Sequence, residues 1–526
     1  MGAVLLITCA NVGSILLARF VDQERELAIR SALGGSRGLL LRPFLAETLV
    51  LSLAGGALGL LLARWSTSLL VTLSPGVTPR QGEVGIDLSV LLFTFAVSLL
   101  TALLTGFMPL FRPSLLRPAG LLNSADRSPG GKGLSILRIN KAIAVFEVAL
   151  AVTLSVGAGL LVRSFLKLTS VSPGFRADQT LAVDVSLPEA RYADESRQAS
   201  FYSALLSQVG AMPEVEHAGV IFPLPMSDIA YAMSFSAEDH PPADPSDAPS
   251  ASLKFISPGL LETMGIPVLR GRGLSASDGT AAPPVALVSR TAAQRVWRDD
   301  DPVGRRVTIG GDKTWITVVG VVGDVHGDSL KSEPSLEIYR PILQAPQSQA
   351  TLVARTKRGL HLPVEALRTR VAQIDPGVVL EDFRTLEQVI ARSTARERFQ
   401  TLLMALFAGL ALCIAAAGVF GALSHAVAQR TREIGVRMAL GASRSSIRQL
   451  VLRQGAQVIL IGLAVGVALS AITNRALGSF LFGVQNLDLV TLGAVAVVMA
   501  GVGLLATALP VLRATAVDPQ VALRYE

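Results

Sequence analysis

RELAIRSALGGSR (residues 25–37) and REIGVRMALGASR (residues 432–444) are the two segments of this 526-residue chain that decide its architecture. Eight of their thirteen positions are identical, at an offset of 407 residues. Each segment follows one long apolar run and precedes another. Self-similarity at a fixed offset marks a repeated structural unit, so we expect the chain to contain one unit twice.

The similarity continues into the flanking runs. Gly55 and Gly59 align with Gly462 and Gly466 in the next apolar run. The run after that ends alike in both copies, at an offset of 401: Pro109, Arg112, Pro118 and Leu122 match Pro510, Arg513, Pro519 and Leu523. Each unit therefore has three apolar runs, a basic loop after the first and a Pro-x-x-Arg exit after the third.

The composition indicates a membrane protein. Half of the residues are hydrophobic and only 17% are charged, with a mean hydropathy of +0.51. Several nearly charge-free windows have about 20 residues, the length that crosses a bilayer core of roughly 30 Å as a helix. Spans are predicted at 1–19, 44–64, 88–111, 140–163, 400–427, 453–474 and 488–512. The predicted fold is α-helical and transmembrane, with about seven spans and a duplicated three-helix unit.

The long polar stretch between the fourth and fifth spans is predicted to be an α+β domain. Residues 180–186 alternate like a strand, and 195–212 place apolar residues on one helical face before a second strand at 215–222. The same order returns at 350–382, which indicates two βαβ-like pieces around a β-rich insertion. The predicted domains are a first three-helix unit at 1–126, a cytoplasmic linker at 127–139, a transmembrane helix at 140–166, an extracytoplasmic domain at 167–398 and a second three-helix unit at 399–526.

The distribution of basic residues predicts the orientation. Nineteen Lys and Arg lie in the loops and tail on one side of the predicted spans, and three lie in the short loops on the other. Because cytoplasmic loops carry the excess of Lys and Arg, the C-terminus is predicted to be cytoplasmic, and the N-terminus and residues 167–398 to lie outside. Residues 167–398 hold 24 Lys and Arg against 28 Asp and Glu, so the basic excess belongs to the membrane part. A nucleic-acid partner is not expected.

The start of the chain suggests missing upstream sequence. Met1 opens almost directly into a span, without the basic region or cleavage site of a signal peptide. The second unit is preceded by a span and an external domain, and the first unit is not. We therefore expect an N-terminal truncation.

The repeated motif is predicted to form a short cytoplasmic helix, a tight turn and a capped return into the membrane. Glu26 with Arg30, and Glu433 with Arg437, have the favourable i,i+4 order of a helical ion pair. Gly34 in the first copy and Gly441 in the second fit a left-handed helix end. Ser36 and Ser443 fit the N-cap of the helix that follows. Two interpretations stay open, an interfacial helix whose arginines contact lipid phosphate and a docking helix for a cytoplasmic partner.

A few residues inside the predicted spans stand out. The Gly-x-x-x-Gly pairs Gly55 with Gly59 and Gly462 with Gly466 are expected to allow close helix packing. Glu147 is the one acid well inside a span, and intramembrane carboxylates are functional candidates. A packing role, either protonated or paired with Arg138 or Lys141, is equally open. Cys9 and Cys413 are expected to be buried small hydrophobes.

Catalytic and metal-binding patterns are hard to find in the sequence. Asp324, His326 and Asp328 alternate, but a metal needs further ligands from other segments, so a solvated loop is the preferred interpretation. Neither G-x-S-x-G nor H-E-x-x-H occurs, and the Gly/Lys cluster at 130–133 does not satisfy the phosphate-loop pattern. We therefore expect neither an enzyme nor a cofactor or metal in this chain, with any nucleotide bound by a partner.

The second motif, two further spans and the tail PVLRATAVDPQVALRYE (510–526) resemble the FtsX-like permease domain. The external stretch resembles the periplasmic core domain of MacB-type permeases in FISPGLLETMGIPVLRGRGLS (255–275), DPVGRRVTIGG (301–311) and VVGVVGDV (318–325). The whole chain is similar to the duplicated permeases of the MacB and lipoprotein-release type of ABC transporter.

This resemblance implies a multi-pass protein of the bacterial plasma (inner) membrane that works with cytoplasmic ABC ATPase subunits. ATP-driven motion would pass through the membrane helices to the external domain, without a central channel for the substrate. The residues that it implies for ATPase coupling are Arg25, Glu26, Arg30, Gly34, Ser36, Arg37, Arg432, Glu433, Arg437, Gly441, Ser443 and Arg444.

Three functions remain open at this stage. The first is a permease subunit that exports or extracts a hydrophobic or peptide substrate. The second is a regulatory transducer that controls an extracytoplasmic protein partner, with nothing transported. The third is an ion-coupled transporter that uses Glu147.

Overall fold

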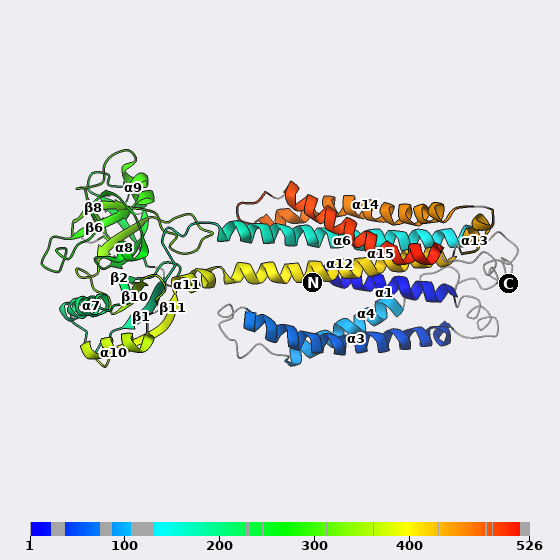
Figure 1. Ribbon diagram of the computed structural model, residues 1–526, viewed down its shortest axis with the longest axis horizontal. Coiled ribbons are helices and arrows are strands. Elements are labelled where there is room, and N and C mark those ends of the chain that lie inside the picture. Colours follow the sequence, from blue (N-terminus) through cyan, green and yellow to red (C-terminus); the bar gives the residue numbers. More distant parts are fainter. Residues whose placement is uncertain are drawn as a thin grey trace. The chain divides into compact units, whose positions relative to one another are not determined.

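The computed structural model divides the chain into two compact units, Met1–Lys167 with Glu397–Glu526, and Leu168–Arg396. We call them the helical unit and the α/β unit (Figure 1). The described residues are 2–22, 37–73, 87–106, 130–227, 229, 231–242, 244, 247–311, 314–360, 362–429, 431–440, 442–478, 481–485 and 488–515.

The helical unit contains helices at all seven predicted spans. They are α1 (Gly2–Asp22), α3 (Arg37–Leu73), α4 (Leu88–Gly106), α6 (Gly130–Thr169), α12 (Ala395–Gln429), α14 (Arg444–Leu477) and α15 (Leu489–Thr515). Several extend past the apolar run, because helical hydrogen bonds continue into the polar flanks.

Five of these helices are long and apolar enough to cross a membrane. The five segments are Leu45–Thr67, Asn140–Thr169, Ala395–Ala428, Arg444–Arg475 and Leu489–Leu512. The described apolar stretches of α1 and α4, Gly2–Gly13 and Leu88–Leu103, are shorter. The described residues therefore contain five candidate spans, and the count of about seven stays a prediction.

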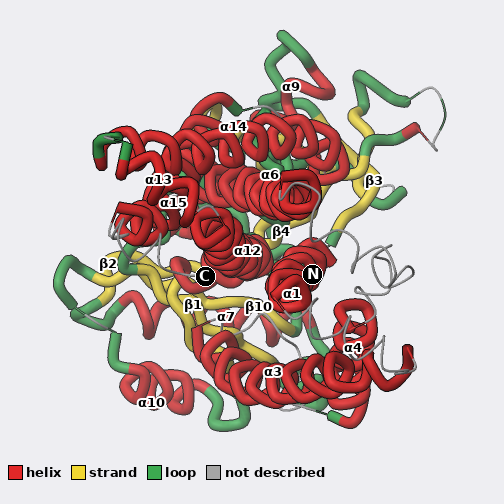
Figure 2. The backbone as a smooth tube through the Cα atoms, turned by 90° about the vertical axis from the view of Figure 1, so that its right-hand side faces the viewer, coloured by secondary structure: helices red, strands yellow, loops and turns green. Residues whose placement is uncertain are grey.

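Helix α6 forms the core of the helical unit. Two-thirds of the residues in its apolar window are buried, 67%, against 6% for α3 and 28% for α12, α14 and α15. Val148, Val152 and Leu160 of α6 join a buried cluster with residues of α12, α14 and α15. The end-on view shows α6 lying between α14 and α12 (Figure 2). The faces of α12, α14 and α15 that point away from α6 are therefore largely exposed on the surface of the helical unit.

The first three helices pack differently from the last three. Ile7 of α1 is fully buried against α6 and α12, and the Asn11 amide donates to the Ile414 carbonyl at 3.4 Å. Helix α3 packs on α4, and a β-carbon at Gly56 would meet Ser98 Oγ at 2.5 Å. In the first unit, α3 and α4 therefore pack on each other, whereas α1 packs on α6 and α12.

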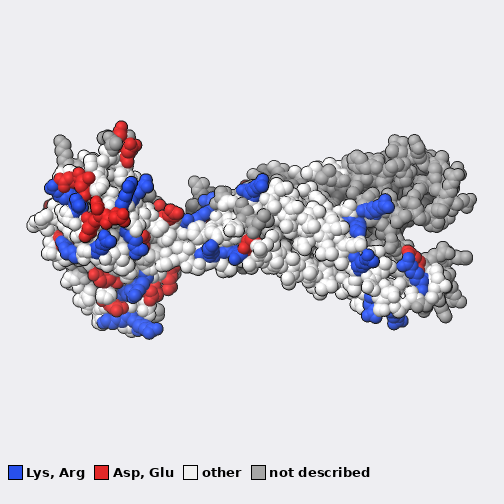
Figure 3. Space-filling view, turned by 90° about the horizontal axis from the view of Figure 1, so that it is seen from above, with Lys and Arg blue, Asp and Glu red and all other residues white. Residues whose placement is uncertain are grey.

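The surface of the helical unit suits a bilayer. In the view of Figure 3 its middle is almost free of charge, with Lys and Arg gathered at its two ends, whereas the α/β unit mixes acidic and basic side chains. Cys413 lies exposed on α12 and Cys9 is half-buried, so the prediction that both are buried is wrong. An apolar thiol fits a helix face that lipid would cover.

The α/β unit is built on one long mixed sheet. Its strands are β1 (Thr180–Ser186), β2 (Val215–Phe222), β3 (Ala232–Ala237), β4 (Ser250–Ile256), β5 (Val268–Gly271), β6 (Val285–Ser289), β7 (Arg306–Ile309), β8 (Ile316–Val322), β9 (Glu337–Pro341), β10 (Gln349–Thr356) and β11 (Val379–Thr385). The order is β11-β1-β10-β2-β4-β3-β7-β8-β6-β9, with β5 beside β8. Strand β9 also pairs in parallel with β4, so the strands from β4 round to β9 close on themselves. Its helices are α7 (Glu195–Gly210), α8 (Leu260–Met264), α9 (Arg290–Trp297), α10 (Val364–Ile374) and α11 (Leu386–Ser393).

The two predicted βαβ-like pieces interleave in this sheet. Strand β10 runs antiparallel to both β1 and β2 and lies between them, while β1 lies between β10 and β11. Each strand–helix–strand piece is therefore split by a strand of the other, the split-βαβ arrangement. The buried side chains of α7 and α10, among them Leu205 and Leu367, join the core below these strands.

Candidate functional site

The second copy of the repeated motif is a short helix that ends in a tight turn. It forms α13 (Thr431–Ala439), and α14 begins directly after it. The N–H of Ala442 donates to the Arg437 carbonyl at 2.9 Å, the long bond of a Schellman helix end. Ser443 Oγ accepts the N–H of Ser446 at 3.3 Å and caps α14. The predicted helix, turn and capped return are therefore all present in this copy.

Helix α13 has two chemically different faces. Ile434 is 3% exposed and lies in a cluster with apolar residues of α12, α14 and α15. The exposed face consists of Glu433, Val436 and Arg437, with Leu440 directly after the helix, and we call these four residues the α13 outer face. Val436 is 40% exposed and Leu440 is 83% exposed. A large apolar side chain left this open beside charges is typical of an interaction surface.

The ion pair on the α13 outer face matches its predicted spacing. The guanidinium of Arg437 pairs with the Glu433 carboxylate one turn earlier, and both side chains are about half exposed. An exposed pair of this kind contributes only about 0.3–0.5 kcal/mol. Its main effect is to hold Arg437 in one orientation on the surface.

The first copy of the motif cannot be compared in the same detail. The side chain of Arg37, at the start of α3, is outside the described residues, and so is the side chain of Arg432 in α13. Arg444 opens α14 and is exposed. Arg25, Glu26, Arg30, Gly34, Ser36 and Gly441 all lie outside the described residues.

The paired glycines of the two units have different surroundings. A β-carbon at Gly462 would meet Val148 Cγ1 at 2.5 Å, and one at Gly466 would meet Val152 Cβ at 2.6 Å. Helix α14 therefore approaches α6 closely at both positions. A β-carbon at Gly55 or Gly59 would meet no described atom within 4 Å. The predicted packing at Gly55 and Gly59 is thus not seen among the described residues, because α3 contacts α4 through Gly56 instead.

Glu147 lies buried where α6 meets α12. It is 1% exposed, and neither carboxylate oxygen has a hydrogen-bond partner. A β-carbon at Gly418 of α12 would overlap this carboxylate. The predicted pairing with Arg138 or Lys141 is not found: Lys141 Nζ donates instead to Gln457 Oε1 of α14 at 2.9 Å.

Polar contacts fasten the far end of α6, near the point where the chain enters the α/β unit. Arg163 pairs with Asp488, which precedes α15. The N–H of Phe482 donates to Ser164 Oγ at 2.8 Å, and Lys167 Nζ donates to the Gly483 carbonyl at 2.5 Å. Helix α6 is therefore attached to the second three-helix unit from Lys141 to Lys167.

Asp488 belongs to a pair of positions that the sequence analysis missed. Asp488 accepts the Thr491 N–H at 2.9 Å, and Asp87 accepts the Val90 N–H at 2.8 Å, so each caps the third helix of its unit. Their offset is 401, the same as for the Pro-x-x-Arg exits. Extending that alignment toward the start of each third helix would have found them.

The α/β unit buries a group of ionisable side chains in its sheet. Lys254, Glu337 and Tyr339 are at most 3% exposed, and the Tyr339 hydroxyl donates to Glu337 Oε2. Burial raises the pKa of Glu337 to about 7 against the opposing charge of Lys254, and burial lowers the pKa of Lys254. The network is only partly satisfied, because the other carboxylate oxygen, Glu337 Oε1, is buried without a hydrogen-bond partner.

The alternating set at 324–328 does not gather around one point. Asp324 Oδ1 accepts the Thr291 N–H at 2.8 Å, and His326 Nδ1 bonds the Ser332 carbonyl at 2.9 Å. Across the described ranges, no three His, Cys, Asp or Glu side chains lie close enough together to hold a metal ion. These side chains support the loops around β8.

Two family models match most of the chain. Residues 1–115 and 405–519 match the FtsX-like permease C-terminal model, and residues 142–385 match the MacB-like periplasmic core domain. The chain belongs to the MacB/FtsX type of ABC transporter permease. The FtsX-like permease family model matches the chain twice, once in each three-helix unit. This duplication agrees with the two copies of the repeated motif.

Relatives of this permease include proteins named macrolide export ATP-binding/permease protein MacB. The protein of Hahella chejuensis is 30% identical over 53% of this chain and 44% of its own length. The one of Chromobacterium violaceum is 28% identical over 42% of this chain and 35% of its own length. The chain thus spans less than half the length of these relatives.

Solved structures are similar to part of this chain at low identity. The periplasmic region of MacB from Actinobacillus actinomycetemcomitans is 12% identical, covering 42% of this chain and 95% of that chain, with a TM-score of 0.29. The extracellular domain of the ABC-type transporter YknZ from Gram-positive bacteria is 14% identical, covering 38% of this chain and 100% of that chain, with a TM-score of 0.25.

Proposed function

We propose that the chain is the membrane subunit of an ABC transporter, coupled to a cytoplasmic ATPase through the α13 outer face. The observation that carries this proposal is the exposure of Val436 and Leu440 on a helix whose other face is locked into the core by Ile434. A force applied to α13 would reach α12, α14 and α15 directly, because one buried cluster joins all four helices. An interfacial helix would need no such rigid attachment.

The long helices are suited to carry this motion across the membrane. Helix α6 has 40 residues and α12 has 35, which gives lengths of about 60 Å and about 50 Å. The chain leaves the helical unit at the ends of these two helices. Movement at the α13 end would therefore reach the connections of the α/β unit without a break in the helix. We propose this mechanotransmission as the means by which ATP hydrolysis reshapes the α/β unit.

The proposed topology has seven spans in the bacterial inner membrane. It places the N-terminus and the α/β unit outside, and the C-terminus and both arginine-bearing motifs in the cytoplasm. The excess of Lys and Arg on one side supports it. ATP would be bound and hydrolysed by the ATPase partner, and this chain would itself catalyse no reaction.

The coupling is tested by reversing charge on the two motifs. Arg437→Glu combined with Arg30→Glu should lower the permease-stimulated ATPase rate roughly tenfold, since a lost docking contact of about 1.4 kcal/mol has that effect. The assay uses the full chain in proteoliposomes with the ABC ATPase that co-purifies with it. Arg475→Glu is the matched control, because Arg475 is exposed near the other end of α14.

The control should change the stimulated rate by less than about twofold, because exposed charges far from an interface couple weakly to it. If the double variant, still folded by circular dichroism, stimulates the ATPase like the unmodified chain, the motifs contact only lipid and the proposal fails.

The transported class is proposed from the family to be a hydrophobic molecule or a peptide, acted on outside the membrane. The alternative is a transducer that controls an extracytoplasmic protein. Deletion of the gene separates them: an exporter changes efflux or lipoprotein sorting, whereas a transducer leaves both unchanged and its α/β unit retains a specific periplasmic protein in pull-down.

Ion-coupled transport through Glu147 has its own test. Glu147→Gln keeps the shape of the side chain beside Gly418 and removes its ability to release a proton. We expect this variant to keep full ATP-dependent activity. Loss of transport with normal folding and normal ATPase stimulation would instead favour ion coupling.

A further inference from the structure

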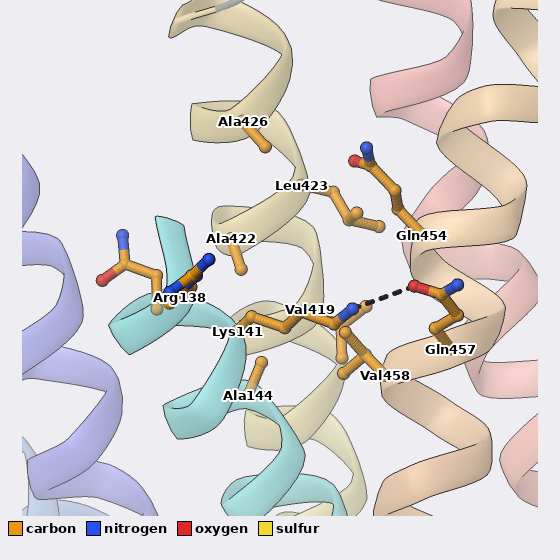
Figure 4. A pocket seen from close by; sticks show the side chains of 11 residues that line it. Arg138, Lys141, Ala144, Val419, Ala422, Leu423, Ala426, Gln454, Gln457 and Val458 are labelled. Carbon is orange, nitrogen blue, oxygen red and sulfur yellow. Dashed lines mark hydrogen bonds between the residues drawn. The ribbon is translucent and has the colours of Figure 1, made fainter. Parts of the chain in front are cut away.

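A cavity of about 220 Å³ opens between α6, α12 and α14 at the α13 end of the helical unit (Figure 4). This volume is far above the ~15 Å³ that a single water needs. Its polar lining comes from Arg138, Asn140 and Lys141 of α6 and from Gln454 and Gln457 of α14. Leu423 and other apolar residues of α12 form the remaining wall.

The lining is positively charged. Arg138 and Lys141 both face the cavity, and none of the described lining residues is acidic. Within the described part of the chain, neither Arg138 nor Lys141 has a carboxylate partner. The Lys141 ammonium donates one hydrogen bond to Gln457 Oε1 and has two further N–H donors. The cavity therefore offers uncompensated positive charge and several hydrogen-bond donors to an anion.

The side-chain oxygen of Asn140 is not part of the accessible lining. Asn140 is 6% exposed, and its Oδ1 is fully buried without a hydrogen-bond partner. The groups that a ligand in the cavity can reach are therefore the two cations, the two glutamines and the apolar wall.

The cavity lies where three helices change from polar to apolar sequence. The apolar segment of α6 begins at Asn140 and that of α12 ends at Ala428. The first turns of α14 are basic and polar through Gln457, and Val458 begins its apolar stretch. These transitions place the cavity at the level of lipid headgroups, on the cytoplasmic side in the topology proposed above.

We infer that this cavity binds the headgroup of an anionic phospholipid such as phosphatidylglycerol. The phosphate lies between Arg138 and Lys141, and the apolar wall of α12 receives the start of an acyl chain. An ethanolamine headgroup fits less well, because its ammonium would meet two cations and no described carboxylate. The bound lipid would join α6, α12 and α14 beside α13.

Native mass spectrometry of the full chain in detergent tests this site with added phosphatidylglycerol, phosphatidylethanolamine or glycerol phosphate. Arg138→Gln with Lys141→Gln should weaken phosphatidylglycerol binding roughly 25-fold, because each basic side chain near an anionic lipid contributes about fivefold in affinity. Arg448→Gln with Arg453→Gln removes two exposed charges of α14 that do not line the cavity, and should leave binding nearly unchanged.

Equal binding of phosphatidylethanolamine, binding of glycerol phosphate as tight as that of the lipid, or equal losses in the two double variants would each overturn the inference. These lipid measurements need no ATPase, so they are independent of the coupling test.

Discussion

The two three-helix units share their motifs and differ in what covers them. Gly462 and Gly466 of α14 hold α6 at contact distance, whereas the aligned Gly55 and Gly59 of α3 face no described atom within 4 Å. Asp488 caps α15 and also pairs with Arg163 of α6; Asp87 caps α4 and, among the described residues, has no cation beside it. Both units therefore carry the glycine pair and the capping aspartate. In the second unit α6 packs on the glycines and pairs with the aspartate, and we call this contact between Asp488 and Arg163 the latch.

The largest difference in stability between the two units should appear when valine replaces the paired glycines. Gly462→Val with Gly466→Val would push added carbons into Val148 and Val152, and overpacking costs about 1–3 kcal/mol per site. Gly55→Val with Gly59→Val adds the same atoms to an open face. We expect a clearly lower thermal midpoint for the first pair and a nearly unchanged one for the second, measured on the full chain in detergent.

Equal destabilisation by the two pairs would contradict the comparison, because it would mean that Gly55 and Gly59 are also covered in the folded protein. Gly409→Val with Gly421→Val on α12 is a control for valine in a helix, since a β-carbon at either position would meet nothing within 4 Å.

The caps that follow the two glycine turns should give a smaller effect. Ser443→Ala removes the acceptor for the Ser446 N–H and should cost about 1 kcal/mol, the usual value of an N-cap. Ser36→Ala should cost the same if the first motif is capped in the same way. Gln449→Ala, at an exposed position further along α14, serves as the control. A loss for Ser443 with none for Ser36 would restrict the capped turn to the second unit.

The latch at Asp488 should give the smallest and most pH-dependent effect. Hydrogen bonds from Thr491 and the charge of Arg163 hold the pKa of Asp488 below its ordinary value of 3.8. Its contribution to stability is therefore present above pH 3.8 and is lost as the pH falls through the lowered pKa. Asp488→Asn should be less stable than the unmodified chain at pH 7, with the gap closing in acid.

Asp87→Asn should show little change at either pH, because asparagine remains a good N-cap and no described cation pairs with Asp87. A gap for Asp488→Asn that does not narrow as the pH falls further below 3.8 would contradict the assignment of its stabilising effect to the carboxylate.

The sequence predicted the helices well because an apolar run of span length leaves few alternatives. The alternation at 180–186 likewise coincides with β1, since one face of that strand is buried. The partners of individual side chains could not be predicted in this way. The carboxylate of Glu147 lies beside Gly418, and Lys141 turns to Gln457, because helices distant in sequence meet there.

The candidate site was predicted in part. The spacing of Glu433, Arg437 and Ser443 was enough to predict the ion pair and the cap, because both are local to one turn of helix. The exposure of Leu440 and the cavity beside Asn140 depend on how α12, α13 and α14 pack together. No local pattern in the sequence carries that information.

Site-specific photo-crosslinking from position 440 in living cells tests the docking of α13 most directly. Leu440 is the most exposed side chain of the α13 outer face, so a photoreactive amino acid there reports what covers it. The account predicts a crosslink to a cytoplasmic ABC ATPase, absent when the probe is moved to exposed position 475 on α14. Crosslinks from 440 to lipid alone, or to an extracytoplasmic protein, would contradict it.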